Sequence, residues 1–272
     1  MRHLFDAIGH CEKIRLCRFS AGCFGIFGHG NVVSLAEALQ PVQDELPTWR
    51  GHNEQSMALA AVAFAKAKRR RQIMIATSSV GPGSSNMITA AATAHANRLP
   101  VLFFSGDTFQ HRFVDPVLQQ VEHFDSPSTT VSDAYRAVTR YWDRITRPEQ
   151  VIQSLPQAVA TMLDPADCGP AYIGLPQDIA AEQSVLGAML LSKDAIADVV
   201  ESLKVDDFYR PAHATVYSAI LDLYAKGEPA DAVMVAGELT KSGEISRIGG
   251  ASYLHTLVSM VPTAANASYY AE

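Results

Sequence analysis

Residues 51–107 read GHNEQSMALAAVAFAKAKRRRQIMIATSSVGPGSSNMITAAATAHANRLPVLFFSGD, and this stretch decides the fold. Small apolar residues recur at helical spacing after Glu54, which predicts a helix with one apolar face that begins at this carboxylate. The run KAKRRR at 66–71 closes that helix. Because cations suit the negative end of a helix dipole, we interpret the run as a solvated helix end, and a nucleic-acid patch is the alternative.

Two buried strands with a helix between them follow in the same stretch. The segments 72–77 and 100–104 are short apolar runs bounded by turn residues, as in buried strands. Gly81-Pro82-Gly83 turns the chain into a small-residue helix predicted over 85–97, and Gly106-Asp107 ends the second strand. A strand, a helix and a strand joined by short turns imply parallel strands with a right-handed crossover.

The segments on either side extend the same pattern. Residues 23–27 predict another strand, and the loop Gly28-His29-Gly30-Asn31 follows it. Loops at the carboxyl ends of parallel strands are where α/β folds bind ligands, so His29 is a candidate site residue; an ordinary loop histidine is the alternative. Further along, a helix beginning at Pro148 and a strand over 171–175 complete an α/β domain.

Length and composition limit the classes of protein to which this chain can belong. The 272 residues are enough for two domains, and a hydrophobic content of 48% allows sizeable cores. No apolar run approaches the roughly 20 residues of a membrane helix, and the charged start lacks a signal peptide's apolar centre. The sequence therefore predicts a cytoplasmic protein. Paired CxxC spacing is absent, which favours free thiols and no metal site among the four cysteines, Cys11, Cys17, Cys23 and Cys168.

The charge is distributed unevenly along the chain. The net charge is −6, and from Ala181 onward there are 12 acidic and 6 basic residues. The preceding part therefore holds 28 − 12 = 16 acidic and 22 − 6 = 16 basic residues and is neutral. An acidic C-terminal part argues against a phosphate-binding surface there, so we expect no direct DNA binding.

The N-terminal part resembles a known family. HNEQ before an Ala-rich helix, TSSVGPGSSN and NRLPVLFFSGD resemble the pyrimidine-binding domain of thiamine diphosphate enzymes. CFGIFGHGN (23–31), DPVLQQ (115–120) and RYWDRITRPEQ (140–150) narrow the resemblance to the trihydroxycyclohexanedione hydrolases of myo-inositol catabolism. The resemblance covers residues 21–178, and residues 1–20 are an unmatched leader. We expect the domain to be incomplete at its start.

The resemblance also implies a site. Such enzymes need a carboxylate at the aminopyrimidine ring nitrogen of the cofactor, and a nonpolar setting that raises the pKa of a glutamate suits the proton exchange there. Glu54 occupies this position, which makes it the predicted catalytic residue; a capping carboxylate is the alternative. The predicted cofactor-binding residues are Glu54, Gly81, Gly83 and Asn86, and the predicted substrate-side residues are His29, Gly30, Asn31 and Gln119.

The other half of the family's site is not found in the sequence. The family holds the cofactor diphosphate through Mg²⁺ in a second α/β domain with a GDG sequence, and GDG does not occur here. Gly106-Asp107-Thr108 lies inside the pyrimidine domain and is no substitute. We therefore expect that this chain alone does not bind thiamine diphosphate tightly. The expected partner is the missing diphosphate-binding domain or another copy of the chain.

From residue 179 onward, helical periodicity replaces the alternation of strands and helices. Ser192 is a candidate N-cap, and Gly227 and Gly243 are candidate helix ends. The pattern predicts a small all-α bundle. The predicted helices cover 182–191, 193–203, 211–225, 232–241 and 251–261, with a last one after Thr263.

This helical part resembles the N-terminal domain of DnaB-type replicative helicases. The matching segments are AEQSVLGAMLL, DDFYRPAH, ILDLYAKGEPAD, ISRIGGASYLHTLV and PTAANASYYAE, within 176–272. The resemblance implies assembly of helicase subunits and contact with primase in DNA replication, with no chemistry. No GxxxxGK[ST] motif for ATP occurs. One further group in this part could suggest a catalytic cluster, but we interpret it as aromatic anchors and a helix start. Its members are Asp207, Phe208, Tyr209, Arg210 and His213.

The two resemblances meet at Pro176-Gln177-Asp178, letters that both families share. Neither family normally contains the other, so the sequence indicates a fusion of two unrelated fragments. Three functional hypotheses stay open: part of a thiamine diphosphate-dependent hydrolase, a helicase-assembly and primase-binding module, or a chimera without catalysis of its own. The third describes the whole chain best, and the first two describe its parts.

Overall fold

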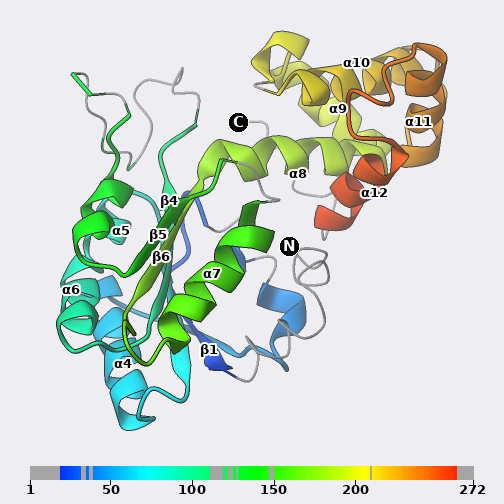
Figure 1. Cartoon of the computed structure of the whole chain (residues 1–272). Helices are drawn as coiled ribbons and strands as arrows, with labels where there is room; N and C mark the ends of the chain where they lie inside the picture. The colour runs from blue at the N-terminus through cyan, green and yellow to red at the C-terminus, as the bar shows by residue number, and fades with distance from the viewer. Residues whose placement is uncertain are drawn as a thin grey trace. The chain divides into compact units, whose positions relative to one another are not determined.

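The computed structural model describes most of the chain, which divides into two compact units, one ending at Ile179 and the other running from Ala180 onward (Figure 1). We describe each unit by itself. The described residues are 19–31, 35–36, 39–110, 119, 121, 125–126, 128–146, 150–208 and 210–261.

The first unit is built on a six-stranded sheet in the order β2-β1-β3-β4-β6-β5, and every neighbouring pair of strands is parallel. The three central strands β3, β4 and β6 are buried along their whole length, as expected for parallel strands covered on both faces. The strands are β1 Ser20–Gly25, β2 Thr48–Arg50, β3 Ile73–Ser78, β4 Leu102–Asp107, β5 Tyr141–Arg144 and β6 Ala171–Pro176.

Helices cover both faces of this sheet (Figure 1). The helices α4 (Glu54–Ala67) and α6 (Ile88–Ala96) pack their alanine-rich sides on one face, together with Met74, Ala76 and Phe103. Helix α7 (Val151–Leu163) packs on the other face against side chains such as Ile75 and Ile173. Alternate side chains of each central strand therefore enter different cores, which fixes the register of the sheet.

The structure confirms the parallel α/β fold and corrects several details of its elements. The edge strands β2 and β5 were not predicted, because three and four partly exposed residues give no apolar run. The helix predicted over 85–97 is two helices, α5 (Pro82–Ser85) and α6, which are separated at Asn86 and Met87. Strand β4 continues through Gly106 and Asp107, which pair with Leu175 and Pro176.

Some predicted elements fall on residues that the structure does not describe. These are most of the unmatched leader 1–20, most of the DPVLQQ segment at 115–120, and the last helix after Thr263. Pro148 is also outside the described residues, and α7 begins at Val151.

The second unit is helical, as predicted. Its core gathers large apolar side chains from all five helices around Leu186, Ile196, Tyr217, Val235 and Leu254. Ser192 caps α9 by accepting from Ala195 N–H at 3.4 Å. Gly227 and Gly243 follow helix ends with φ of 75° and 76°. The helices are α8 Gln177–Leu191, α9 Lys193–Ser202, α10 Pro211–Ala225, α11 Ala232–Lys241 and α12 Ala251–Met260.

Helix α8 begins five residues before the predicted Glu182, directly after β6, so the boundary between the two units falls inside its first turn. In the described part of the chain, no helix has both the length and the apolar character needed to span a bilayer.

Candidate functional site

The candidate site lies at the carboxyl edge of the sheet. Because all six strands are parallel, the segments that follow β1, β2 and β3 leave the sheet at the same edge. The segment after β2 enters α4, the segment after β3 enters α5, and the loop 28–31 follows β1. The predicted site residues of the α/β unit, apart from Gln119, are on these three connections.

Glu54 is the first residue of α4. Asn53 is the N-cap, with an extended backbone, and its side chain accepts from Ser56 N–H at 2.9 Å. Asn53 therefore caps the helix, and Glu54 is free of that task. Asn86 Nδ2 donates to Glu54 Oε2 at 2.8 Å, and Oε1 accepts no hydrogen bond from any described residue. The carboxylate is partly exposed.

The turn Gly81–Gly83 needs glycine at both ends. Gly81 has a φ of 64°, and a β-carbon there would lie 1.7 Å from Gln119 O. A β-carbon on Gly83 would lie 2.4 Å from Ser79 Oγ and 3.6 Å from Glu54 Oε1. The two glycines therefore keep space beside the carboxylate and bring the Gln119 backbone against the turn. Gln119 itself is exposed.

The loop 28–31 is fixed from within by Asn31, which is fully buried. Its Oδ1 accepts from Gly28 N–H at 2.9 Å, and its Nδ2 donates to Ile26 O at 3.1 Å and to Thr77 Oγ1 at 3.2 Å. The Asn31 side chain is thus occupied inside the protein. The Gly30 φ is 88°, a conformation that favours glycine.

His29 remains as the loop residue with a side chain available for a ligand. Its carbonyl accepts from Val80 N–H at 3.0 Å, which ties the loop to the turn after β3, and the residue is partly exposed. A β-carbon on Gly30 would lie 2.7 Å from Gly106 Cα, so the loop also packs closely on β4.

The structure therefore brings Glu54, Gly83 and Asn86 together, and Gly81 places Gln119 beside the same turn. It ties His29 to this group through the backbone of Val80. Among the described residues, no hydrogen bond or ion pair joins the His29 ring to the Glu54 carboxylate.

Sequence reasoning missed a buried polar network behind this site. Ser84 Oγ donates to Ser105 Oγ at 2.9 Å, and the Tyr172 hydroxyl lies 2.6 Å from Ser105 Oγ and 2.7 Å from Ser132 Oγ. The Tyr135 hydroxyl donates to Ser84 O at 2.5 Å. Burial, with the nearby Asp107 charge next, raises the pKa of Tyr172 well above its usual range. The network anchors α5, and Ser105, which follows the apolar residues of β4, is its one sequence signal.

Asp107 is the second missed residue. It is 1% exposed, and its Oδ2 accepts from Arg144 Nε at 2.5 Å and from Thr130 Oγ1 at 3.3 Å. Its Oδ1 accepts from Thr108 N–H at 2.8 Å. Removing one partner of a buried ion pair is strongly destabilising, so this pair fixes the end of β4. The sequence pattern predicts Asp107 only as the end of a strand.

The described residues give no sign of a metal site. No cluster of three or more His, Cys, Asp or Glu side chains suited to a metal ion occurs among the described residues. Cys23 and Cys168 are buried free thiols, and Cys11 and Cys17 lie outside the described residues.

The helical unit holds a buried histidine with partners on both ring nitrogens. His213 is fully buried; its Nδ1 lies 2.5 Å from Glu182 Oε2, and its Nε2 lies 2.6 Å from the Tyr253 hydroxyl. Phe208 is buried against Tyr217, with ring centroids 4.7 Å apart. These contacts suit a packing role for this part of the chain, and Tyr209 lies outside the described residues.

Comparisons with known families match the two parts of the chain separately. Residues 21–126 match the model of the thiamine pyrophosphate enzyme N-terminal TPP binding domain, thiamine pyrophosphate being another name for thiamine diphosphate. Residues 174–272 match the model of the DnaB-like helicase N terminal domain. Both resemblances seen in the sequence are confirmed by these matches.

Individual relatives agree with the family models. A 3D-(3,5/4)-trihydroxycyclohexane-1,2-dione hydrolase of Geobacillus thermodenitrificans is 54% identical over 165 residues, covering 61% of this chain and 26% of that protein. The Bacillus thuringiensis protein of the same name is 50% identical over 199 residues, covering 69% of this chain and 31% of that protein. The chain thus spans between a quarter and a third of the length of these relatives.

A solved structure is similar to the C-terminal part. It is the N-terminal domain of DnaB helicase from Mycobacterium tuberculosis, with 75% sequence identity and a TM-score of 0.33. The match covers 34% of this chain and 63% of that one.

Proposed function

We propose that the α/β unit is the pyrimidine-side half of a thiamine diphosphate site, with Glu54 as its proton-exchanging carboxylate. One observation carries the proposal. Asn86 holds Glu54 Oε2, while Gly83 leaves space beside Oε1, so one carboxylate oxygen is oriented and the other can meet a ligand. The helix cap comes from Asn53, so Glu54 is not needed as the capping residue.

The residues present fit the aminopyrimidine end of this cofactor. A carboxylate can exchange a proton with a ring nitrogen, and a glycine turn lets a planar ring approach the backbone closely. When bound, the cofactor supplies the carbon nucleophile for cleavage of a carbon–carbon bond. Glu54 holds and returns the proton at Oε1, and Asn86 keeps the carboxylate oriented. A domain packed over this edge would bury Glu54 and exclude water.

The Mg²⁺–diphosphate end of the cofactor does not fit this unit. Its sequence holds no GDG motif, and none of its described residues forms a metal-binding cluster. We propose that a separate domain or another protein chain binds that end. On this proposal the fusion chain has no catalysis by itself, and the hydrolase and replication roles belong to its parts.

A hybrid enzyme tests the half-site. In the Geobacillus thermodenitrificans relative, the matching segment is replaced by residues 21–178 of this chain, and hydrolysis of the trihydroxycyclohexanedione is measured. We expect activity in the hybrid and its loss in Glu54→Gln, because an amide cannot take up and return the proton. Glu45→Gln is the matched control, since Glu45 is an exposed glutamate away from the site.

The outcomes of the hybrid experiment are distinct. Full activity of Glu54→Gln removes this residue from the reaction. A folded hybrid that binds cofactor and has no activity shows that the segment is not a working half-site. Loss of activity in the Glu45→Gln control as well would point to a general effect of charge removal.

We further propose that the helical unit assembles with helicase subunits and binds primase. The match of residues 174–272 to the DnaB N-terminal domain supports this. Val233 and Met234 on α11 are 69% and 38% exposed, and they offer apolar contact area for a partner. Sedimentation of residues 180–272 with DnaB and with primase tests the two interactions separately. If the helical unit sediments with neither protein, the proposal is wrong.

The acidic balance of the helical unit predicts no direct DNA binding, and fluorescence anisotropy tests this part of the proposal. With 12 acidic and 6 basic residues from Ala181 onward, phosphate contacts are disfavoured. Binding to single- or double-stranded DNA tighter than roughly 1 μM near physiological salt would contradict the electrostatic argument.

A further inference from the structure

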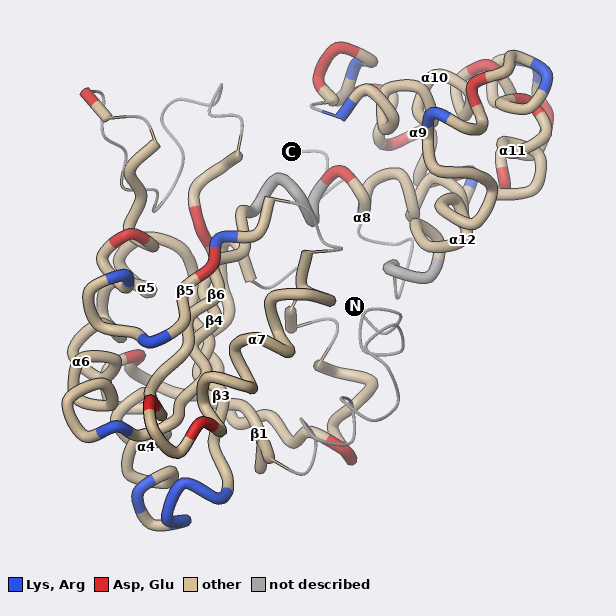
Figure 2. Tube along the Cα trace, in the orientation of Figure 1, with Lys and Arg blue, Asp and Glu red and all other residues tan. Residues whose placement is uncertain are grey.

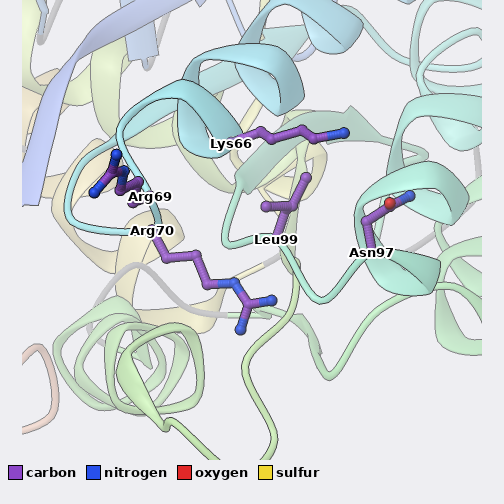
Figure 3. A pocket seen from close by; sticks show the side chains of 5 residues that line it. All are labelled: Lys66, Arg69, Arg70, Asn97 and Leu99. Atoms are coloured by element: carbon purple, nitrogen blue, oxygen red, sulfur yellow. The ribbon is translucent and has the colours of Figure 1, made fainter.

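A cavity lies at the opposite edge of the sheet from Glu54. It occupies about 340 Å³ between the ends of α4 and α6, next to the segments that lead into β3 and β4. Because α4 and α6 end where the chain enters β3 and β4, the cavity lies at the amino edge of the sheet, away from the candidate site. Three cations, one amide and one apolar side chain line it, namely Lys66, Arg69, Arg70, Asn97 and Leu99 (Figure 3).

The turn after α4 forms one wall of the cavity. Arg69 N–H donates to Lys66 O at 3.0 Å and Arg70 N–H donates to Ala65 O at 2.9 Å, the pair of bonds typical of a Schellman motif. Arg69 and Arg70 have φ of 51° and 63°. Glycine usually occupies the left-handed position of this motif, and a residue with a β-carbon costs free energy there.

The turn after α6 repeats the motif as the second wall. Arg98 N–H donates to His95 O at 3.1 Å, and Leu99 N–H donates to Ala94 O at 2.9 Å. Arg98 has a φ of 50° and its Nη1 donates to Ala166 O at 3.2 Å. Three of the four non-glycine residues with positive φ in the described part of the chain are therefore arginines of these two turns.

The two motifs direct complementary side chains to one cavity. Arg70 and Leu99 occupy equivalent positions in the two motifs, and both line it. Figure 3 shows Lys66 and Arg70 extending on either side of Leu99, which is buried. No lining cation forms a salt bridge with any residue that the structure describes.

The side chains that line the cavity carry only positive charge, and Asp164 and Asp167 lie in the same region outside the lining, since they act on the same Cys168 thiol as Arg70. Each helix C-terminus contributes about half a negative charge, whereas the lining side chains contribute three full positive charges. The last carbonyls of both helices also accept hydrogen bonds from backbone N–H groups, which reduces their electrostatic attraction for the cations. Figure 2 shows Lys and Arg gathered where α4 ends.

We propose that this cavity binds a small polyphosphate, that is, a ligand with two adjacent phosphate groups. A guanidinium offers paired donors to phosphate oxygens, an ammonium adds a point charge, and Leu99 gives an apolar floor. The cations come from one turn over one cavity. A nucleic-acid groove would instead need cations spaced along several nucleotides, so a small ligand fits better than a polymer.

Calorimetric titration of the full chain with inorganic pyrophosphate tests the proposal. The variant Lys66→Gln/Arg70→Asn removes two lining cations, and asparagine tolerates the left-handed φ at position 70. We expect saturable binding to the parent chain and at least about tenfold weaker binding to this variant, from the loss of two charge-assisted contacts. Lys66→Gln alone, which leaves the turn unchanged, should weaken binding by a smaller factor.

The variant Lys68→Gln/Arg71→Gln is the matched control. It removes two charges from the same segment, and neither residue lines the cavity. We expect its affinity to stay within about twofold of the parent, since exposed charges outside the cavity are screened by salt. Equal losses in both double variants, or no saturable heat up to about 1 mM pyrophosphate, would overturn the proposal. So would tighter binding of a single-stranded oligonucleotide than of pyrophosphate.

Discussion

Asn86 Nδ2 donates to Glu54 Oε2 at 2.8 Å although 32 residues separate them in the sequence. The contact joins the start of α4 to the break between α5 and α6. It therefore depends on two helices that the sheet holds side by side, and it orients the carboxylate of the candidate site.

Asn86→Asp should turn this contact into a repulsion. We expect the variant to lose about 1–3 kcal/mol of unfolding free energy at pH 7. Two close carboxylates raise each other's folded-state pKa, so the loss should be small below the unfolded pKa and grow as pH rises from 4 to 7. Both tryptophans, Trp49 and Trp142, lie in the α/β unit, so urea unfolding followed by tryptophan fluorescence reports it alone.

Asn86→Leu is the control for this pH dependence. It removes the hydrogen bond without adding a charge, so its loss should vary little with pH. Matching pH profiles for the two variants would contradict the electrostatic explanation.

His213→Phe should destabilise the helical unit selectively. The substitution removes both buried ring nitrogens and their contacts with Glu182 and Tyr253, at a cost of roughly 2–4 kcal/mol. We expect the helical transition in circular dichroism to move to lower urea while the tryptophan transition stays in place. His255→Phe is the control, because it makes the same change at an exposed position on α12. Equal shifts in the two variants would contradict a special role for the buried contacts.

The α/β unit should lose stability at alkaline pH. Burial raises the pKa of Cys23 from the ordinary 9.0 to about 12, and burial also raises the pKa of Tyr135. The unfolded state releases these protons first, so the contribution of these groups to stability should be constant below pH 9.0 and fall from there toward about 12. Cys23→Ala should show a shallower fall by tryptophan fluorescence; an unchanged slope would remove Cys23 as a cause.

Cys23 should also be chemically inert in the folded chain. Only the thiolate reacts with iodoacetamide, and at pH 8 the raised pKa leaves almost none. Peptide mass spectrometry should find Cys23 unmodified in buffer and modified in urea. Rapid labelling in buffer would show that β1 opens.

The two units should unfold independently. Inserting Gly-Gly-Ser between Ile179 and Ala180 interrupts the first turn of α8 at the boundary. We expect the tryptophan and circular dichroism midpoints each to change by less than about 2 °C, well under the shift of a 1 kcal/mol effect. A single shared transition before insertion, or a large shift of both midpoints after it, would contradict independence.

The sequence predicts the elements that have long patterns and misses those that depend on pairing. Helices α10 (Pro211–Ala225) and α11 have the predicted bounds, because proline or aspartate at the start and glycine after the end agree with the apolar period. Strand β2 is too short to give a pattern and forms because β1 lies beside it.

In the candidate site, too, residues within a local motif can be predicted from the sequence, whereas residues that depend on long-range pairing cannot. Glu54 and the glycines carry a motif, so the resemblance could point to them. Asp107 and Arg144 carry no local signal, because their contact exists only after β4, β6 and β5 align. Likewise, nothing local in the sequence shows that Asn31 turns inward, although its amide makes three hydrogen bonds there.

Those three bonds have a thermodynamic consequence. The loop 28–31 is already closed by the protein's own groups before any ligand arrives. A molecule that binds beside His29 therefore meets a preorganised wall, and its affinity is not reduced by the entropy of ordering that loop. Free and bound forms of this wall should superpose closely, as in rigid lock-and-key recognition.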